Sequence, residues 1–202
     1  MPEAASYAAV EVLRDGTRAE IRALRPDDRA AILAAVDHTS ERSLYRRFFA
    51  AKRSFSEREI AFFLNIDFAR HVALVAVVRH DDGGEEIVGG GRYIVLQPGR
   101  AEAAFSVVDQ FQGRGLGTVL LRHLAAIARN AGLHEFVAEV LPDNTPMLEV
   151  FEHSGLVANG NGRQTHGTQA EGVATRAGLV ERELLRHPRP DLGNLLQGRG
   201  AG

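Results

Sequence analysis

The stretch Gln112-Gly113-Arg114-Gly115-Leu116-Gly117-Thr118 is the part of the sequence from which the fold can be worked out. An apolar run at residues 105–108 precedes it, and leucines at helical spacing follow it. Its three glycines stand at alternate positions, so the backbone can turn sharply and approach a ligand without Cβ clashes. The N–H groups of such a loop and of the next helical turn converge where the helix dipole adds positive charge. This arrangement suits a phosphate or pyrophosphate, although an ordinary strand-to-helix turn uses glycines in the same way.

The glycine spacing differs from that of the two best-known phosphate-binding loops. Thr118 stands where the dinucleotide pattern Gly-x-Gly-x-x-Gly would have its last glycine, and no Gly-Lys-Ser/Thr follows as in a P-loop. The stretch instead resembles the Gln/Arg-x-x-Gly-x-Gly/Ala signature of the GNAT N-acetyltransferase superfamily, whose loop binds the pyrophosphate of acetyl-CoA. Gln112, Gly115 and Gly117 occupy the signature positions, and Arg114 is expected to add a cation.

Length and composition fit one folded domain. The chain has 202 residues, of which 45% are hydrophobic and 25% charged, as in soluble globular proteins. No apolar stretch could span a bilayer and residues 1–10 do not resemble a signal peptide, so we expect a cytoplasmic protein with no membrane partner. The absence of cysteine excludes disulfides, thiolate metal sites and a cysteine-linked acyl intermediate. A net charge of −2 gives no overall attraction to nucleic acid.

Hydrophobic periodicity predicts an alternation of strands and helices along the chain. Strands at residues 10–13 and 19–24 flank an Asp15-Gly16 hairpin turn. Helices are expected next at 26–37, 44–49 and 57–64, the last with a Ser56–Glu59 capping box, and strands at 71–78, 86–95 and 101–108. After the glycine loop and its helix, we expect a strand at 136–141 and a short helix with Thr145 as N-cap. A loop at 158–171 between edge strands and a last strand at 180–185 complete the prediction. The strand at 136–141 should lie parallel to the one before the loop, because a helical crossover joins them.

This order of elements resembles the GNAT fold over residues 10–185. The resemblance implies an α/β (α+β) architecture with a central mixed, mostly antiparallel sheet, flanked by helices. A parallel pair of strands should splay apart at the acetyl-CoA site. We expect residues 1–9 to be a flexible N-terminus, residues 10–185 to be the acetyltransferase domain and residues 186–202 to be a disordered C-terminal tail.

The resemblance extends to the GNAT domain of bacterial Pat-type protein lysine acetyltransferases. It is carried by the stretches at residues 13–17, 21–22, 25–28, 40–49, 136–141 and 144–148. In that family the domain is often fused to an acyl-CoA-synthetase-like or cyclic-nucleotide-binding domain. Neither has room here, so we expect a stand-alone version. The implied activity is direct transfer of acetyl from acetyl-CoA to an amine, with a protein lysine as acceptor, for example on an acyl-CoA synthetase.

Transfer to an amine needs a group that removes a proton and groups that polarise the thioester carbonyl. Strand alternation puts Glu102 on one face with Ala104 and Ser106. In Pat-like enzymes a glutamate at the corresponding place is implicated as general base, directly or through water, although a surface glutamate near a turn would look the same. Glu139, on the neighbouring strand, is the second candidate base, or a charge that forms an ion pair. Phe151 stands where many GNAT enzymes have a tyrosine acid, so coenzyme A is expected to leave unassisted or to take a proton from water.

The resemblance implies that the main chain holds most of the acetyl-CoA. The pyrophosphate should be bound by the backbone N–H groups of Gln112, Gly113, Arg114, Gly115, Leu116, Gly117 and Thr118. The main chain of Val107 and Val108 should pair with the pantetheine amides. Asn144 is expected either to contact the cofactor or to cap a helix. The eight histidines show no metal-ligand spacing, so no metal is expected.

Alternatives remain open at the level of the sequence. A small-molecule amine or amino-acid N-acetyltransferase would carry the same loop, and so would a non-catalytic acyl-CoA-binding sensor. The aromatic and arginine residues between positions 42 and 63 favour amphipathic helices with a buried face, while nucleic-acid binding and a wall of the acceptor site are the other interpretations. The sequence carries no signal for an oligomeric state.

Overall fold

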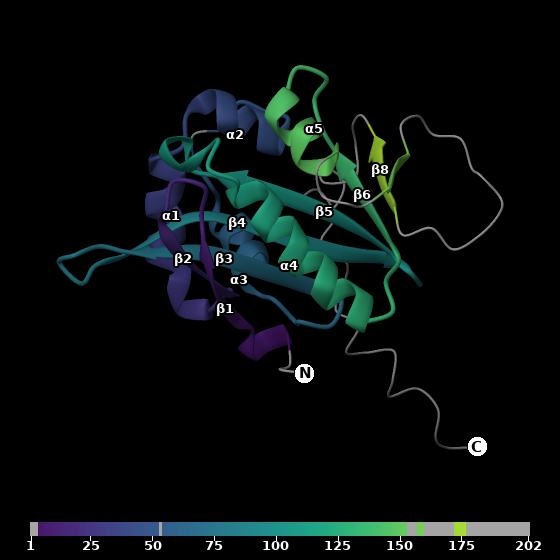
Figure 1. Ribbon diagram of the computed structural model, residues 1–202, viewed down its shortest axis with the longest axis horizontal. Helices are drawn as coiled ribbons and strands as arrows, with labels where there is room; N and C mark the ends of the chain where they lie inside the picture. The colour runs from purple at the N-terminus through teal and green to yellow at the C-terminus, as the bar shows by residue number, and fades with distance from the viewer. Residues whose placement is uncertain (1–3, 53, 153–156, 160–171, 177–202) are drawn as a thin grey trace.

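A computed structural model describes residues 4–52, 54–152, 157–159 and 172–176 of the chain. Strands and helices alternate along it much as the hydrophobic pattern predicts (Figure 1). Its elements are η1 (Ala4–Ser6), β1 (Ala8–Val12), β2 (Arg18–Ala23), η2 (Pro26–Asp28), α1 (Arg29–Asp37), α2 (Glu41–Phe48), α3 (Glu57–Leu64), β3 (His71–Arg79), β4 (Glu85–Gln97), β5 (Arg100–Val107), η3 (Asp109–Phe111), α4 (Leu116–Asn130), β6 (Glu135–Glu139), α5 (Thr145–Glu152), β7 (Val157–Asn159) and β8 (Gly172–Arg176), where η marks a 3-10 helix.

The strands form one mixed sheet in the order β1-β2-β3-β4-β5-β6-β8-β7. Neighbours from β1 to β5 are antiparallel, and β5 and β6 are parallel. The predicted mixed, mostly antiparallel sheet with a parallel pair is therefore confirmed. Strands β8 and β7 continue the sheet beyond β6, both in parallel pairings. The strand predicted at 180–185 and the tail predicted at 186–202 lie outside the described residues.

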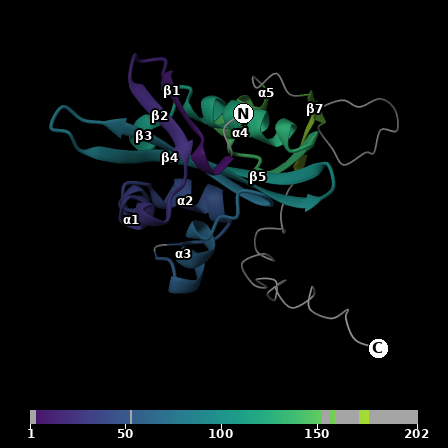
Figure 2. The same ribbon diagram turned by 90° about the horizontal axis from the view of Figure 1, so that it is seen from below.

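Helices cover both faces of the sheet, with α1, α2 and α3 on one side and α4 and α5 on the other (Figure 2). Strand β3 is buried over residues 71–78 because it meets both layers. Its even-numbered apolar residues from 72 to 78 join the core under α4, and residues 73, 75 and 77 join a second cluster with α1 residues. Alternation along a strand thus divides one apolar run between two cores.

Three glycines in β4 bring α4 close to the sheet. A Cβ atom on Gly91 would lie 2.6 Å from Phe105 and 2.9 Å from Leu124, so these side chains occupy the space that a side chain at 91 would need. A register shift in β3 at Ala76/Val77 faces the same stretch of β4. The sheet is therefore both locally irregular and closely approached here, as glycines inside a strand often indicate.

Several element boundaries differ from the sequence-based expectation. Residues 1–9 were expected to be flexible, whereas Ala4–Ser6 forms a 3-10 helix and β1 starts at Ala8, which pairs with Arg22. Helix α5 starts at Thr145 rather than after it. The capping box of α3 is present, with Ser56 and Glu59 exchanging hydrogen bonds as expected.

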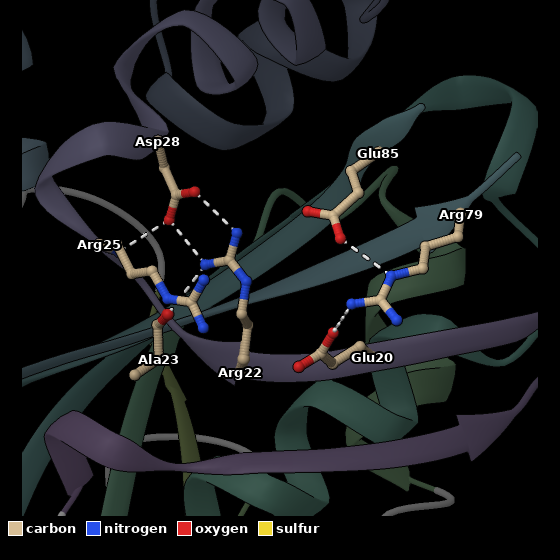
Figure 3. Close-up of polar contacts among 7 residues, drawn as sticks. All are labelled: Glu20, Arg22, Ala23, Arg25, Asp28, Arg79 and Glu85. Atoms are coloured by element: carbon tan, nitrogen blue, oxygen red, sulfur yellow. Dashed lines mark hydrogen bonds and ion pairs between the residues drawn. The ribbon is translucent and has the colours of Figure 1, made fainter. Parts of the chain in front are cut away.

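A buried ion pair fastens the start of α1 to the sheet (Figure 3). The Arg22 guanidinium of β2 donates to both carboxylate oxygens of Asp28 at 2.7 Å, and the Arg25 backbone N–H donates to the same carboxylate at 2.7 Å. Burial alone would raise the pKa of Asp28, but the hydrogen bonds from Arg22 and Arg25 outweigh it and hold that pKa below its usual value. The Ile21-Arg22 and Arg25-Pro26-Asp27-Asp28 stretches therefore fix the position of the helical layer.

Candidate active site

The parallel strands β5 and β6 separate soon after they meet. They pair only at Arg100 with Glu135, Ala101 with Phe136 and Glu102 with Val137. Past Glu102 a cleft of about 320 Å³ opens between them, lined also by α2, α5 and the glycine loop. The predicted splay of the parallel pair is thus present, at the place where the sequence predicted it.

The backbone of β5 turns hydrogen-bonding groups toward this cleft. The Val108 N–H donates to the Val88 carbonyl across the sheet at 3.0 Å. Because antiparallel pairs alternate between bonded and non-bonded, Val107, opposite Gly89, must direct its N–H and C=O away from β4 and toward β6. Val107 therefore has its N–H on the cleft side, and its carbonyl accepts a hydrogen bond from the Gln112 side-chain amide at 3.1 Å, whereas Val108 uses its N–H inside the sheet.

The glycine loop has the conformation that its sequence requires. Gly113 and Gly115 have φ of 74° and 85°, in the left-handed region that favours glycine, and α4 starts at Leu116. The first N–H groups of a helix have no partner within it, so this end can bind an anion. All the predicted loop residues except Arg114 line the cleft, namely Gln112, Gly113, Gly115, Leu116, Gly117 and Thr118.

The side chain of Arg114, expected to add a cation for the cofactor, does not line the cleft and has partners outside it. Its guanidinium donates to Asp15 Oδ2 at 2.6 Å and to the Gln110 carbonyl at 2.6 Å. It also lies 4.5 Å from the centre of the Phe111 ring. The pair with Asp15 explains the difference, because a residue about a hundred positions earlier cannot be paired with Arg114 from the sequence alone.

Both predicted catalytic glutamates line the cleft. Glu102 is 8% exposed and lies on β5, whose alternate residues Ala103 and Phe105 pack into the core under α4. Glu102 therefore faces the opposite side of the sheet, toward the layer of α1 to α3. Glu139, half-buried, is the last residue of β6. The cleft thus brings a carboxylate from each of the two separated strands near the backbone groups of β5.

Two further expectations concern the short helix α5. Asn144 lines the cleft, and its backbone carbonyl accepts hydrogen bonds from Met147 and Leu148 N–H at 3.0 and 3.1 Å. It therefore stands at the start of α5, so its position is compatible with both expected roles. Phe151 is 2% exposed, with its ring edge-on to Phe105 at 6.2 Å. Phe151 thus belongs to the core and also lines the cleft, but its side chain has no proton to give.

Several cleft residues were not among the site residues expected from the sequence, although a wall of the acceptor site was one interpretation of the segment that contains Arg46 and Arg47. Arg14, from the β1–β2 turn, and Ser43, Arg46 and Arg47, from α2, line the cleft together with the loop. Arg46 donates to the Asp143 carbonyl at 2.8 Å and so links α2 to the segment before α5. These residues lie in the stretches 13–17 and 40–49 that carry the resemblance to Pat-type domains, but that resemblance assigned them no role in the cleft.

Comparisons with known proteins agree with this geometry. A family model described as the acetyltransferase (GNAT) family matches residues 30–156. The chain belongs to this family. It is a GNAT N-acetyltransferase, and enzymes of the family use acetyl-CoA as acyl donor.

Its similarity reaches the Pat-type members of the GNAT family. Acetyltransferase PA5475 of Pseudomonas aeruginosa is 35% identical over 149 residues, which are 73% of this chain and 80% of that protein. Acetyltransferase Pat of Mycolicibacterium smegmatis is 28% identical over 149 residues, which are 72% of this chain but 43% of Pat. The crystal structure of the GNAT domain of S. lividans PAT is 34% identical, with a TM-score of 0.68, over 80% of this chain and 92% of that one. The GNAT fold and the resemblance to Pat-type domains are thereby confirmed.

Two searches of the described residues concern other kinds of site. Within them, no cluster of three or more histidine, aspartate or glutamate side chains could hold a metal ion. Over the same part of the chain, every helix is too short or too polar to cross a bilayer.

Proposed function

We propose that this enzyme transfers acetyl from acetyl-CoA directly to the side-chain amine of a protein lysine, with Glu102 as general base. The observation that carries the proposal is the single cleft that joins the anion-binding loop to Glu102 along one edge of β5. A donor lying along Val107 would run from the loop toward Glu102. The similarity to Pat and to the S. lividans PAT domain supports the choice of a protein lysine.

The groups of this chain account for each change in the reaction. Glu102 accepts a proton from the attacking ammonium, directly or through water, so that the amine nitrogen can bond to the acetyl carbon. Backbone N–H groups of β5 that point into the cleft can donate to the carbonyl oxygen as it gains charge. As the carbon–sulfur bond breaks, the nitrogen of the adduct gives its second proton to water, and the coenzyme A sulfur takes a proton from water, because Phe151 offers none.

A second cavity favours the small-amine alternative. It has a volume of about 130 Å³ and lies between the sheet and helices α1 to α3. It shares Arg47, Ala104 and Ser106 with the cleft, so the two spaces adjoin. Most of its lining is apolar, which would suit a small amine with an apolar body rather than an extended protein segment.

The test is release of free coenzyme A from acetyl-CoA, followed with a thiol reagent. One arm supplies protein acceptors, including an acyl-CoA synthetase with its catalytic lysine, and the other arm supplies small amines and amino acids. We expect release with the protein acceptor, lost in Glu102→Gln but retained in Glu139→Gln, while both variants still bind acetyl-CoA in a calorimetric titration.

Each other outcome points to a different conclusion. Release with small amines alone would assign the enzyme to the second candidate. Binding without release in any arm would identify a sensor, and loss of release in Glu139→Gln alone would move the base to β6.

A further inference from the structure

We propose that Arg14 provides the guanidinium that binds a phosphate group of coenzyme A, in the role that the sequence suggests for Arg114. The inference rests on the proposed function only in taking acetyl-CoA as the donor. It concerns a residue of the β1–β2 turn, about a hundred positions before the glycine loop that it serves.

The cation inside the loop already has an acidic partner. Arg114 pairs with Asp15 and with the Gln110 carbonyl, and the Phe111 ring lies against its guanidinium. The pKa of Asp15 is lowered, chiefly by a hydrogen bond from the Thr17 N–H and further by Arg114, so this partner stays ionised at neutral pH. A phosphate at Arg114 would therefore lie beside the negative charge of Asp15, which offsets the charge of this arginine.

Arg14 lies against the same loop with its charge available. Its side chain lines the cleft, and its Nε atom is 3.2 Å from the position that a Cβ of Gly115 would take. Gly115 is the residue just before α4, so Arg14 packs beside the N–H groups at the positive end of that helix. Within the described residues Arg14 forms no ion pair, whereas Arg46, another cation of the cleft, is bound to Asp143.

Arg114 has a positioning role, because its contacts hold the β1–β2 turn, and with it Arg14, against the glycine loop. The Arg14 N–H donates to the Arg114 carbonyl at 3.1 Å, and Asp15, the next residue, holds the Arg114 side chain. The turn itself is closed by hydrogen bonds from Leu13 N–H to the Thr17 carbonyl at 2.8 Å and from Thr17 N–H to Asp15 at 3.0 Å. Two contacts thus tie the turn to the loop and set Arg14 over Gly115.

The ligand chemistry is a phosphate ester, for which the planar guanidinium is well suited. Coenzyme A carries two sources of it, the pyrophosphate and the 3′-phosphate. Dephospho-coenzyme A lacks only the second, so it distinguishes them. A loss of affinity in an Arg14 variant that is equal for both ligands assigns the pyrophosphate, and a loss seen only with coenzyme A assigns the 3′-phosphate.

The experiment is calorimetric titration of the full chain with coenzyme A and with dephospho-coenzyme A, at low and high salt. We expect Arg14→Ala to weaken coenzyme A binding about tenfold, in the range of a charge-assisted hydrogen bond at an accessible site, and to reduce its salt dependence. Arg14→Lys should retain part of the affinity. The matched control is Arg18→Ala, which removes the same charge from an exposed position of β2 that does not line the cleft. In turnover, Arg14→Ala should raise the KM for acetyl-CoA and leave kcat nearly unchanged.

A second variant separates this proposal from its rival. Asp15→Asn weakens the tie between turn and loop, so we expect weaker binding. If Arg114 were the phosphate ligand, Asp15→Asn would release it and binding would tighten. Tighter binding in Asp15→Asn, or an Arg14→Ala variant that binds like Arg18→Ala, would overturn the inference and leave the proposed function standing. Failure of the unaltered chain to bind coenzyme A would instead overturn both.

Discussion

Removal of the Asp28 carboxylate tests how the helical layer is held to the sheet. In Asp28→Ala the Arg22 guanidinium, whose side chain is 6% exposed, loses two hydrogen bonds of 2.7 Å and the carboxylate with which it forms its ion pair in Figure 3. An unpaired charge at a buried position costs about 3–5 kcal/mol of unfolding free energy. The double variant Arg22→Met/Asp28→Leu leaves no buried charge, so we expect it to be more stable than Asp28→Ala.

The matched control lies in the same view. Arg79 pairs with Glu20 at 3.3 Å and Glu85 at 2.9 Å, but its side chain is 70% exposed. Arg79→Ala should therefore cost less than about 1 kcal/mol, as exposed pairs do. Urea unfolding monitored by circular dichroism measures all the variants. If Asp28→Ala lost no more stability than Arg79→Ala, the account of this pair would be wrong.

The same pair predicts a response to acid. The folded-state pKa of Asp28 is lowered from its ordinary value of 3.8, so its stabilising effect is complete above that value and is lost as the pH falls through the folded pKa. We expect the unaltered chain to lose stability steeply below about pH 4. In the double variant the free energy of unfolding should fall less steeply below this pH. An equally steep fall in both proteins would contradict the assignment.

Three other changes have outcomes that the structure determines. Gly91→Ala places a methyl group 2.6 Å from Phe105, and we expect a loss of about 1–3 kcal/mol in urea unfolding, whereas Gly132→Ala, with no neighbour within 4 Å, should suffer only from its positive φ. Burial lowers the pKa of His71 to about 3, so only the unfolded state takes up a proton there, and the free energy of unfolding should fall by about 1.4 kcal/mol from pH 7.5 to pH 5.5. His71→Gln should remove this dependence on pH, and an unchanged dependence would refute the assignment. Gln112→Ala removes donors to Ser43 and to the Val107 carbonyl, both at 3.1 Å, so the KM for acetyl-CoA should change more than kcat, and an unaltered KM would show that this side chain is not coupled to the cleft.

The features that the sequence predicts well are encoded locally. Gly113 and Gly115 adopt positive φ, a conformation available to few other residues, so their spacing identified the loop. Alternation along β5 put Glu102 on the face opposite Phe105, because side chains in a strand point to opposite faces in turn. The α3 cap followed from Ser56 and Glu59, which interact within one helical turn.

The features that the sequence does not predict depend on distant partners. The direction of the Val108 N–H is set by its pairing with Val88, twenty positions away in the chain. Arg114 is drawn away from the cleft by Asp15, and Arg14 reaches the loop only because the fold places the β1–β2 turn beside it. Each of these contacts joins segments that share no pattern, so side-chain partners in the site required the tertiary structure.

The early separation of β5 and β6 gives the middle of the sheet two inner margins that no neighbouring strand covers. Along the β5 margin the Val107 N–H points away from β4, and the Val107 carbonyl accepts a hydrogen bond from the Gln112 side-chain amide at 3.1 Å, so a bound molecule could take the N–H directly and the carbonyl by displacing that amide. A pantetheine arm bound there would hydrogen-bond to the exposed edge of β5, in the position that a neighbouring strand would otherwise occupy. Binding of the donor would then supply hydrogen bonds that no neighbouring strand supplies. The amide groups of β5 and β6 should therefore exchange their hydrogens more slowly when the donor is bound.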